Sequence, residues 1–263
     1  MNCLLCRLRK TRYVFTFAGK DIYKDKLNIK SDIAWYECDN CGVFFSKHYK
    51  HINRIYEDDT LYDGQYDRES IRQRYNKIMS LDDSVSDNAG RVRRVKDYHG
   101  RFAGGGIVLD VGAGLGVFLG KFLDTRYQGE ALETNSVAAE HLKQQLNIPV
   151  YQCLVQNFTG SDNRYDLITA NRVIEHIERP IEVLMKIKHL LKKNGIFYIE
   201  LPDTMGYEFV GNTEEGFASG HYMVYNCKSL LYLLNKAGLD VLALDRVKEP
   251  SGKFTVFAFA RRG

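Results

Sequence analysis

Two cysteine pairs near the N-terminus have the spacing of metal ligands. Cys3 and Cys6 form one C-x2-C pair, and Cys38 and Cys41 form a second pair after 31 intervening residues. Each two-residue spacer lets a tight turn direct both sulfur atoms to the same point, so the quartet predicts a structural Zn²⁺ site with four thiolate ligands. Buried free thiols and disulfides are the alternatives, and a reducing compartment disfavours the disulfides.

The residues that follow the two pairs differ in kind. Gly42 follows the second pair and suits a turn whose N–H groups face sulfur, whereas Arg7 holds the matching position after the first pair and does not suit it. The other two cysteines, Cys153 and Cys227, stand alone in the sequence. We expect both to be core thiols and not nucleophiles.

A glycine-rich loop directly follows an apolar stretch. Residues 107–116 read IVLDVGAGLG, with glycine at positions 112, 114 and 116. Glycines at the start of a helix let a ligand touch backbone that a Cβ atom would block. The third glycine comes one position too early for the dinucleotide fingerprint, and the Gly-Lys-Ser/Thr of a Walker loop is absent. The loop therefore disfavours NAD and nucleoside triphosphates.

Two carboxylates beside this loop favour a zwitterionic nucleoside ligand. Asp110 would repel a pyrophosphate but attract an ammonium group. Glu133, 23 residues further on, follows the next apolar stretch, where a carboxylate can accept hydrogen bonds from both hydroxyls of a ribose. An adenosine joined to an amino acid satisfies both groups. The alternative is an ordinary strand-to-helix turn followed by a surface acid.

The elements that would position these residues alternate between strands and helices. β-type apolar stretches predict strands at 107–111, 127–132, 149–153, 165–170, 195–201, 239–246 and 253–260. Helical spacing predicts helices at 68–79, 87–98, 115–125, 136–146, 180–192 and 227–237. The hairpin residues Glu249, Pro250, Ser251 and Gly252 make the last strand antiparallel to its neighbour. The expected fold class is α/β, preceded by a small β-rich head with strands at 12–17 and 33–37.

The core resembles the class I S-adenosylmethionine-dependent methyltransferases. The resemblance rests on VLDVGAGLG at 108–116, on Glu133, on YDLITANRVIEHIERP at 165–180 and on KHLLKKNGIFYIELPD at 188–203. It implies a Rossmann-like seven-stranded sheet whose last strand is antiparallel. It also implies a cofactor site in which Asp110, Gly112, Gly114 and Gly116 face the methionine part, Glu133 the ribose, Leu154 and Val155 the adenine, and Asn171 the loop beneath the sulfonium.

Methyl transfer to a hydroxyl requires an aligned acceptor and a base for its proton. Glu175 and His176 follow the fourth strand, and His221 and Tyr222 lie in the long loop before the helix at 227. In the family, such a loop carries a His-Tyr or similar pair into the acceptor pocket, so His221 is the first candidate for the base and Tyr222 for an orienting group. The alternative is that His176 binds backbone at a strand end and that the loop pair is half-buried packing.

The order of the parts resembles a narrower group. The head with CLLC and WYECDNCGVFFS, the tyrosine-rich segment IYEDDTLYDGQYD and the core resemble methyltransferases with a zinc-binding head, typified by deoxysugar C-methyltransferases of antibiotic pathways. Those enzymes usually carry a further C-terminal domain, whereas this sequence stops after the hairpin, which weighs against carbon methylation and against a deoxysugar substrate. We expect a zinc-ribbon head at 1–50, a linker (49–63) and lead-in helices within 51–100, and a methyltransferase domain at 101–263.

Composition sets the remaining expectations. The 263 residues are 44% hydrophobic and 27% charged, which is ordinary for a folded protein, and no apolar stretch is long enough for a membrane span or a signal peptide. Residues 1–50 hold ten Lys and Arg against five acids, and this positive surplus is modest beside that of a nucleic-acid-binding arm. The basic run Arg91, Arg93, Arg94 and Lys96 is interrupted by valines and predicts an amphipathic helix with a solvated basic face.

Together these features predict a cytoplasmic methyltransferase that uses S-adenosylmethionine and a structural Zn²⁺. The expected acceptor is a small polar molecule, a sugar or nucleotide-linked sugar, methylated at oxygen. The alternatives are carbon methylation of a sugar, RNA or protein methylation with the head as docking module, and a non-catalytic binding protein. We expect neither a membrane nor a nucleic acid as the main partner.

Overall fold

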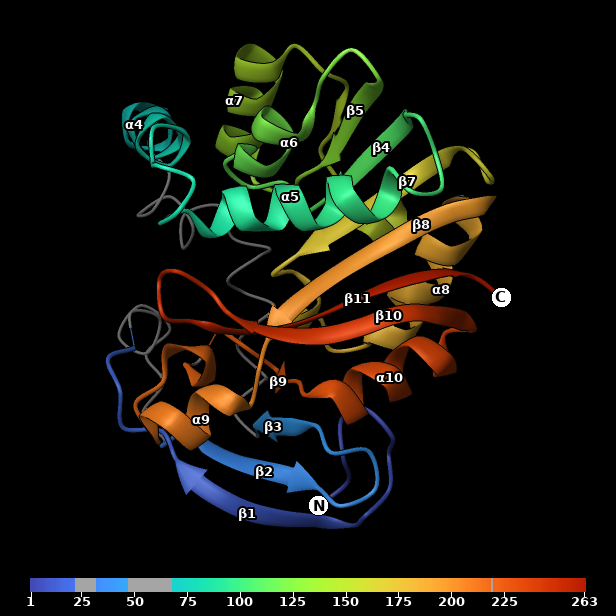
Figure 1. Cartoon of the computed structure of the whole chain (residues 1–263). Helices are drawn as coiled ribbons and strands as arrows, with labels where there is room; N and C mark the ends of the chain where they lie inside the picture. The colour runs from blue at the N-terminus through green and yellow to red at the C-terminus, as the bar shows by residue number, and fades with distance from the viewer. Residues whose placement is uncertain (22–31, 47–67, 219) are drawn as a thin grey trace.

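The computed structural model describes residues 1–21, 32–46, 68–218 and 220–263. The predicted linker at 49–63 lies outside the described residues. Within the described ranges, no helix is both long enough and apolar enough to cross a membrane. Two sheets organise the chain, and the smaller one lies beside α9 and α10 (Figure 1).

The larger sheet has seven strands in the order β10-β11-β8-β7-β4-β5-β6. Its strands are β4 (Gly106–Val111), β5 (Tyr127–Leu132), β6 (Val150–Tyr151), β7 (Tyr165–Asn171), β8 (Leu191–Pro202), β10 (Leu239–Lys248) and β11 (Phe254–Arg262). The pairings among β4 to β8 are parallel, whereas β11 runs antiparallel to both β8 and β10. The predicted α/β fold with an antiparallel last strand is confirmed.

Helices cover both faces of this sheet. The α-helices are α4 (Arg68–Met79), α5 (Asp87–His99), α6 (Val117–Phe122), α7 (Ser136–Leu146), α8 (Pro180–Leu190), α9 (Met205–Val210) and α10 (Cys227–Lys236). Of these, α9 packs against the smaller sheet through Tyr207. Alternate residues of β8 enter two separate cores: Phe197, Ile199 and Leu201 pack on the side of α8 and α10, and Ile196 and Tyr198 on the side of α5 and α6. Because alternate residues are buried on opposite faces of the sheet, nearly every residue of such a strand is apolar, and the strands appear in the sequence as nearly continuous apolar runs.

Most element ends match the sequence prediction within two residues. The helix predicted at 115–125 is shorter, because Leu123 adopts an extended conformation and the Asp124 side chain accepts a hydrogen bond from the N–H of Arg126 at 3.0 Å, which forms a turn. The helix predicted to continue to residue 192 ends at Leu190, and β8 begins at the next residue.

The smaller sheet is antiparallel and includes a strand from the distant loop between β8 and α10. Its strands are β1 (Thr11–Thr16), β2 (Ala34–Cys38), β3 (Phe44–Ser46) and β9 (Met223–Val224). The indole N–H of Trp35 donates to the carbonyl of Phe217 at 2.9 Å, and both side chains are fully buried. The small β-rich head is therefore present, and its core is shared with the loop between β8 and α10.

Candidate functional site

The four head cysteines converge on one point. Cys3 Sγ lies 3.6 Å from Cys41 Sγ and Cys6 Sγ lies 3.5 Å from Cys38 Sγ, while all four sulfurs lie within 4.8 Å of one another. In a tetrahedron with metal–sulfur bonds of about 2.3 Å, the sulfurs are about 3.8 Å apart, so the arrangement fits Zn²⁺. Burial raises the pKa of the Cys38 thiol, so its thiolate needs a nearby cation.

The two cysteine turns have the same backbone structure. The N–H of Arg7 donates to the carbonyl of Cys3 at 3.0 Å, and the N–H of Gly42 donates to that of Cys38 at 2.8 Å. Arg7 and Gly42 both have left-handed φ angles, 64° and 76°. The expectation that Arg7 would not suit the turn is therefore wrong. The first turn keeps this shape at a cost of about 1–2 kcal/mol for a non-glycine residue.

The glycine loop between β4 and α6 has left-handed backbone at each glycine. The φ angles of Gly112, Gly114 and Gly116 are 67°, 52° and 75°. A Cβ atom at Gly112 would lie 2.6 Å from Val173, and one at Gly116 would lie 2.4 Å from Leu142. A Cβ at Gly114 would meet nothing within 4 Å among the residues described. The outer two glycines serve internal packing, and the middle one faces space that a ligand can fill.

Asp110, the next-to-last residue of β4, is buried in a polar cluster. Its Oδ1 accepts hydrogen bonds from Thr169 Oγ1 at 2.6 Å and from Asn171 Nδ2 at 3.0 Å. Burial raises the pKa of Asp110 to about 7 despite these bonds. Asn171 Oδ1 is buried and has no hydrogen-bond partner in the part of the chain that the structure describes. An ammonium group would satisfy both side chains, as expected for the methionine end of the cofactor.

Glu133 bridges the glycine loop and the helix that follows β5. Its Oε2 accepts from the N–H of Gly114 at 2.7 Å, and its Oε1 accepts from the N–H of Asn135 at 2.9 Å. The residue is 8% exposed, and burial raises the pKa of its carboxyl group. Thr134 also hydrogen-bonds to this carboxylate through its backbone and its side chain, so ribose hydroxyls would share the carboxylate oxygens with these donors.

The two residues predicted to flank adenine begin a short 3-10 turn after β6. Leu154 is 45% exposed and precedes the turn, and Val155 is buried as its first residue. An exposed leucine at a strand end is compatible with stacking on a base. The assignment of both residues to adenine stays a prediction.

The end of β7 holds the backbone of the loop that carries His221. His176 Nδ1 lies 2.6 Å from the carbonyl oxygen of Gly220, and the N–H of Tyr222 donates to the carbonyl of Glu175 at 2.9 Å. These contacts flank His221 on both sides. The contact of His176 with the Gly220 carbonyl agrees with the alternative interpretation, in which His176 binds backbone near a strand end.

His221 lies against His176, with ring centroids 4.6 Å apart and an interplanar angle of 62°. Its Nδ1 lies 2.6 Å from the carbonyl oxygen of Gly216. A carbonyl only accepts, so the neutral ring carries its hydrogen on Nδ1 and its lone pair on Nε2. Burial raises the pKa of Glu175 to about 8 and lowers that of His176 to about 3. The structure thus brings three of the four predicted catalytic residues together.

Tyr222 points away from solvent. It is 1% exposed and belongs to the apolar core that also contains Met223, Tyr225 and the head residue Phe45. The side chain therefore anchors the loop in this core. Its predicted role in orienting the acceptor stays a prediction.

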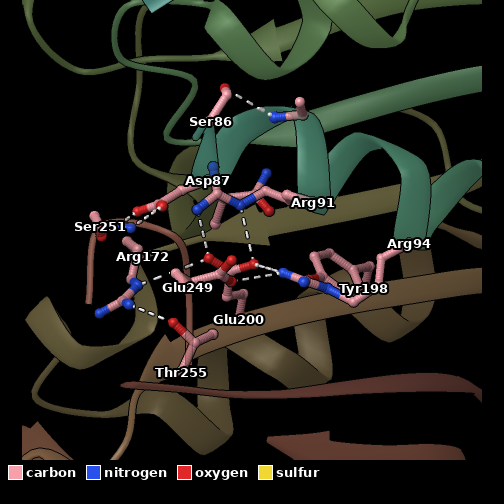
Figure 2. A network of polar contacts seen from close by, with 12 residues as sticks. Ser86, Asp87, Arg91, Arg94, Arg172, Tyr198, Glu200, Glu249, Ser251 and Thr255 are labelled. Atoms are coloured by element: carbon pink, nitrogen blue, oxygen red, sulfur yellow. Dashed lines mark hydrogen bonds and ion pairs between the residues drawn. The ribbon is translucent and has the colours of Figure 1, made fainter. Parts of the chain in front are cut away.

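A buried ion cluster beside the site was not predicted from the sequence (Figure 2). Glu200, fully buried on β8, accepts from Arg91 Nε at 2.9 Å, from Arg94 Nη2 at 3.0 Å and from the Tyr198 hydroxyl at 2.8 Å. Arg94 Nη2 also donates to Glu249 Oε1 at 2.9 Å. Burial alone would raise the pKa of Glu200, but the three surrounding guanidinium charges outweigh it and lower the pKa to about 2.

The solvated basic face predicted for α5 is therefore wrong for Arg91 and Arg94, whose side chains are 13% and 19% exposed. A sequence signal did exist: Glu200 is a lone acid within the apolar strand FYIELP, and such an acid needs a basic partner.

Arg172 supplies the third positive charge and was also missed. It directly follows Asn171 and has a left-handed φ of 59°. Its N–H donates to the carbonyl of Glu200 at 3.0 Å and its Nη2 to Thr255 Oγ1 at 2.5 Å. Nothing in the local sequence indicates this conformation, which depends on contacts with β8 and β11.

Comparison with known proteins gives the family. A family model described as "Methyltransferase domain" matches residues 84–244. The ubiquinone biosynthesis O-methyltransferase of Glaesserella parasuis serovar 5 is 31% identical over 36% of this chain and 41% of its own length. The N-terminal Xaa-Pro-Lys N-methyltransferase 1-A of Xenopus laevis is 29% identical over 42% of this chain and 48% of its own length. The chain thus matches less than half the length of these relatives.

Solved structures share the fold over most of the chain. The 1,6-didemethyltoxoflavin-N1-methyltransferase of Burkholderia thailandensis, solved with 1,6-didemethyltoxoflavin and S-adenosylhomocysteine, has a TM-score of 0.61 at 18% identity, covering 89% of this chain and 97% of that one. A SAM-dependent methyltransferase from Aquifex aeolicus has a TM-score of 0.53 at 19% identity, covering 74% and 98%. The prediction of a methyltransferase is confirmed at the level of fold and family. The glycine loop, Asp110 and Glu133 lie within the matched region, and the chain belongs to the methyltransferase domain family.

Proposed function

We propose that this protein transfers a methyl group from S-adenosylmethionine to a hydroxyl of a small polar acceptor, a sugar or a nucleotide-linked sugar. The observation that carries the proposal is the Glu133 carboxylate, held by the N–H of Gly114 beside the space that this glycine leaves open. Asp110 and Asn171 provide a second polar contact suited to an ammonium group. These residues fit the two ends of S-adenosylmethionine.

When bound, S-adenosylmethionine supplies a methyl group already activated on a sulfonium. The residues of this chain then have two tasks, to align the acceptor oxygen with that methyl and to take its proton. In our proposal Nε2 of His221 accepts the hydroxyl proton as the new oxygen–carbon bond forms and the carbon–sulfur bond breaks. His176 and Glu175 act as positioning residues, because their contacts with Gly220 and Tyr222 fix the backbone around His221.

We also propose that the four-cysteine site holds a structural Zn²⁺. In this proposal the site fixes the loop between β8 and α10 (residues 203–226), which we call the acceptor loop. Asn226 Nδ2 donates to the carbonyl of Gly42, in the second cysteine turn, at 2.9 Å. The N–H of Ser46 at the end of β3 donates to the carbonyl of Tyr222 at 3.3 Å, next to the β3–β9 pairing. A cytoplasmic location suits these reduced thiols.

Two other acceptor classes have specific support. The β-rich head with its cysteine turns resembles that of the deoxysugar C-methyltransferases, and this resemblance supports carbon methylation of a sugar. The same base would then remove a C–H proton. The Xenopus relative acts on protein N-termini by its name, which supports a protein acceptor docked on the head. The Glaesserella relative, an O-methyltransferase by its name, supports the hydroxyl acceptor that we favour.

A transfer screen with methyl-labelled S-adenosylmethionine tests the proposal. The zinc-loaded full chain would be offered nucleotide sugars, quinone precursors, an Xaa-Pro-Lys peptide and tRNA in parallel. We expect label in a nucleotide sugar, at an oxygen identified by NMR. Label on carbon would overturn the oxygen assignment, and label only in peptide or tRNA would overturn the small-molecule acceptor.

A further inference from the structure

Glu175, His176 and His221 bring a carboxylate and two imidazoles together beside the acceptor loop. Glu175 and His176 belong to a 3-10 turn after β7, and His221 comes from the loop before β9. One ligand atom from each of the three side chains lies within 4.8 Å of the other two. We propose that this cluster is a second metal site, which binds a divalent transition-metal cation and thereby inhibits the enzyme.

The hydrogen bonds of both histidines prepare their rings to act as ligands. Each Nδ1 lies 2.6 Å from a backbone carbonyl oxygen, that of Gly220 for His176 and that of Gly216 for His221. Because the hydrogen of each ring then resides on Nδ1, each histidine has its available lone pair on Nε2. Histidines that bind metals usually donate their other ring N–H in this way, which fixes the tautomer and the orientation of the ring.

Glu175 supplies an independent observation. Its side chain belongs to a residue that is 1% exposed, and its Oε2 has no hydrogen-bond partner among the residues that the structure describes. A buried carboxyl oxygen without a partner is costly, and a coordinated cation would satisfy it. A carboxylate oxygen of this residue also lies within 4.8 Å of a ring nitrogen of each histidine.

The donor set and its surroundings identify the class of cation. Two imidazoles and one carboxylate suit Zn²⁺, Co²⁺, Ni²⁺ or Fe²⁺, whereas Mg²⁺ and Ca²⁺ prefer oxygen ligands only. The positive charge of Arg172 acts on both Glu175 and His176 and opposes a cation held by charge alone. Coordination by nitrogen therefore favours a transition metal over the alkaline-earth ions.

The inhibitory part of this inference rests on the proposed function. Nε2 of His221 cannot bind a metal and accept the acceptor's proton at the same time. An occupied site would therefore slow methyl transfer without blocking the cofactor residues Asp110 and Glu133, which lie on other strands. The binding part does not depend on methyl transfer.

Cobalt titration of the zinc-loaded full chain tests the binding. With the four cysteines saturated by Zn²⁺, we expect one further Co²⁺ per chain, with visible d–d absorption and no thiolate-to-cobalt charge-transfer band. Glu175→Gln and His221→Ala should each weaken this binding by roughly 10- to 100-fold. His189→Ala, which removes an exposed histidine of α8, is the matched control and should bind Co²⁺ like the wild type.

The outcomes separate this site from the proposed function. Absence of a second Co²⁺, or a second Co²⁺ that persists at full affinity in Glu175→Gln and His221→Ala, would overturn the site. His176→Gln serves as a further test if His221→Ala fails to fold, as judged by circular dichroism. Co²⁺ binding at this site in a protein that methylates nothing in the screen would reject the proposed function and retain the site. Unchanged methyl transfer with the site saturated by Co²⁺ would overturn the inhibition.

Discussion

At the scale of single residues, the proposed contact of Glu133 with the ribose gives the most specific prediction about the cofactor. Glu133→Ala should weaken binding of S-adenosylhomocysteine by about 10- to 100-fold, because two ribose hydroxyls lose a charge-assisted partner worth about 1.5–3 kcal/mol and the Gly114 N–H loses its acceptor. Calorimetry would measure this loss. Glu140→Ala, an exposed acid on α7, should bind normally. Equal affinities in the two variants would remove Glu133 from the site.

Asp110 predicts how cofactor binding depends on pH. Burial raises its pKa to about 7, so the carboxyl group is mostly neutral below this pH and cannot pair with an ammonium group. Affinity for S-adenosylhomocysteine should therefore rise with pH through about 7 and fall again only at more alkaline pH, where the α-amino group of the ligand loses its proton. Calorimetry across this range would follow both limbs. Asp110→Asn should lack the rising limb, and a rise that persists in this variant would contradict the assignment.

At the scale of elements, Glu200 joins α5 to the sheet through Arg91 and Arg94. Its folded-state pKa of about 2 lies below the ordinary value of 4.5 for a glutamate, so its contribution to stability is present above pH 4.5 and is lost as the pH falls toward 2. The loss amounts to about 3 kcal/mol in the free energy of unfolding. Urea denaturation from pH 7 to pH 3 should show a falling midpoint in the wild type.

The matched variants for this experiment are Glu200→Gln and Glu182→Gln. Glu200→Gln should lower the free energy of unfolding at pH 7 by roughly 3–5 kcal/mol, because it leaves buried arginines without their partner, and should flatten the acid dependence. Glu182 is exposed on α8, so its variant should behave like the wild type. A Glu200→Gln protein as stable as the wild type would show that the cluster contributes nothing.

The elements also show how far sequence reasoning reaches. Periodicity and turn residues were enough to predict the sheet, because each long strand carries its own apolar pattern. They missed β9, since two residues hold no pattern and Met223–Val224 becomes a strand only by pairing with β3. They predicted that the glycine loop follows β4 and that Glu133 follows β5, and the structure has both at these positions, because each depends on a strand end in its own local sequence. They missed Arg172, whose left-handed backbone depends on distant strands.

At the scale of the whole molecule, the head is coupled to the acceptor loop. Cys38→Ser should release the metal and loosen both the head and residues 203–226, since Trp35, β3 and the second cysteine turn all contact that loop. A misplaced loop should lower kcat by roughly 10²-fold while affinity for S-adenosylhomocysteine stays close to that of the wild type. Hydrogen exchange and calorimetry would separate the two effects. Cys153→Ser is the control, and full activity in metal-free Cys38→Ser would contradict the coupling.

The most direct test of the proposed function is the single-turnover rate of methyl transfer from S-adenosylmethionine to the acceptor that the screen identifies. The rate would be measured for the wild type and for His221→Ala in buffer freed of divalent metals. We predict a fall of roughly 10²- to 10⁴-fold in His221→Ala with unchanged affinity for S-adenosylhomocysteine, as expected when a base is lost from the chemical step. A variant that transfers the methyl group at the wild-type rate would contradict it.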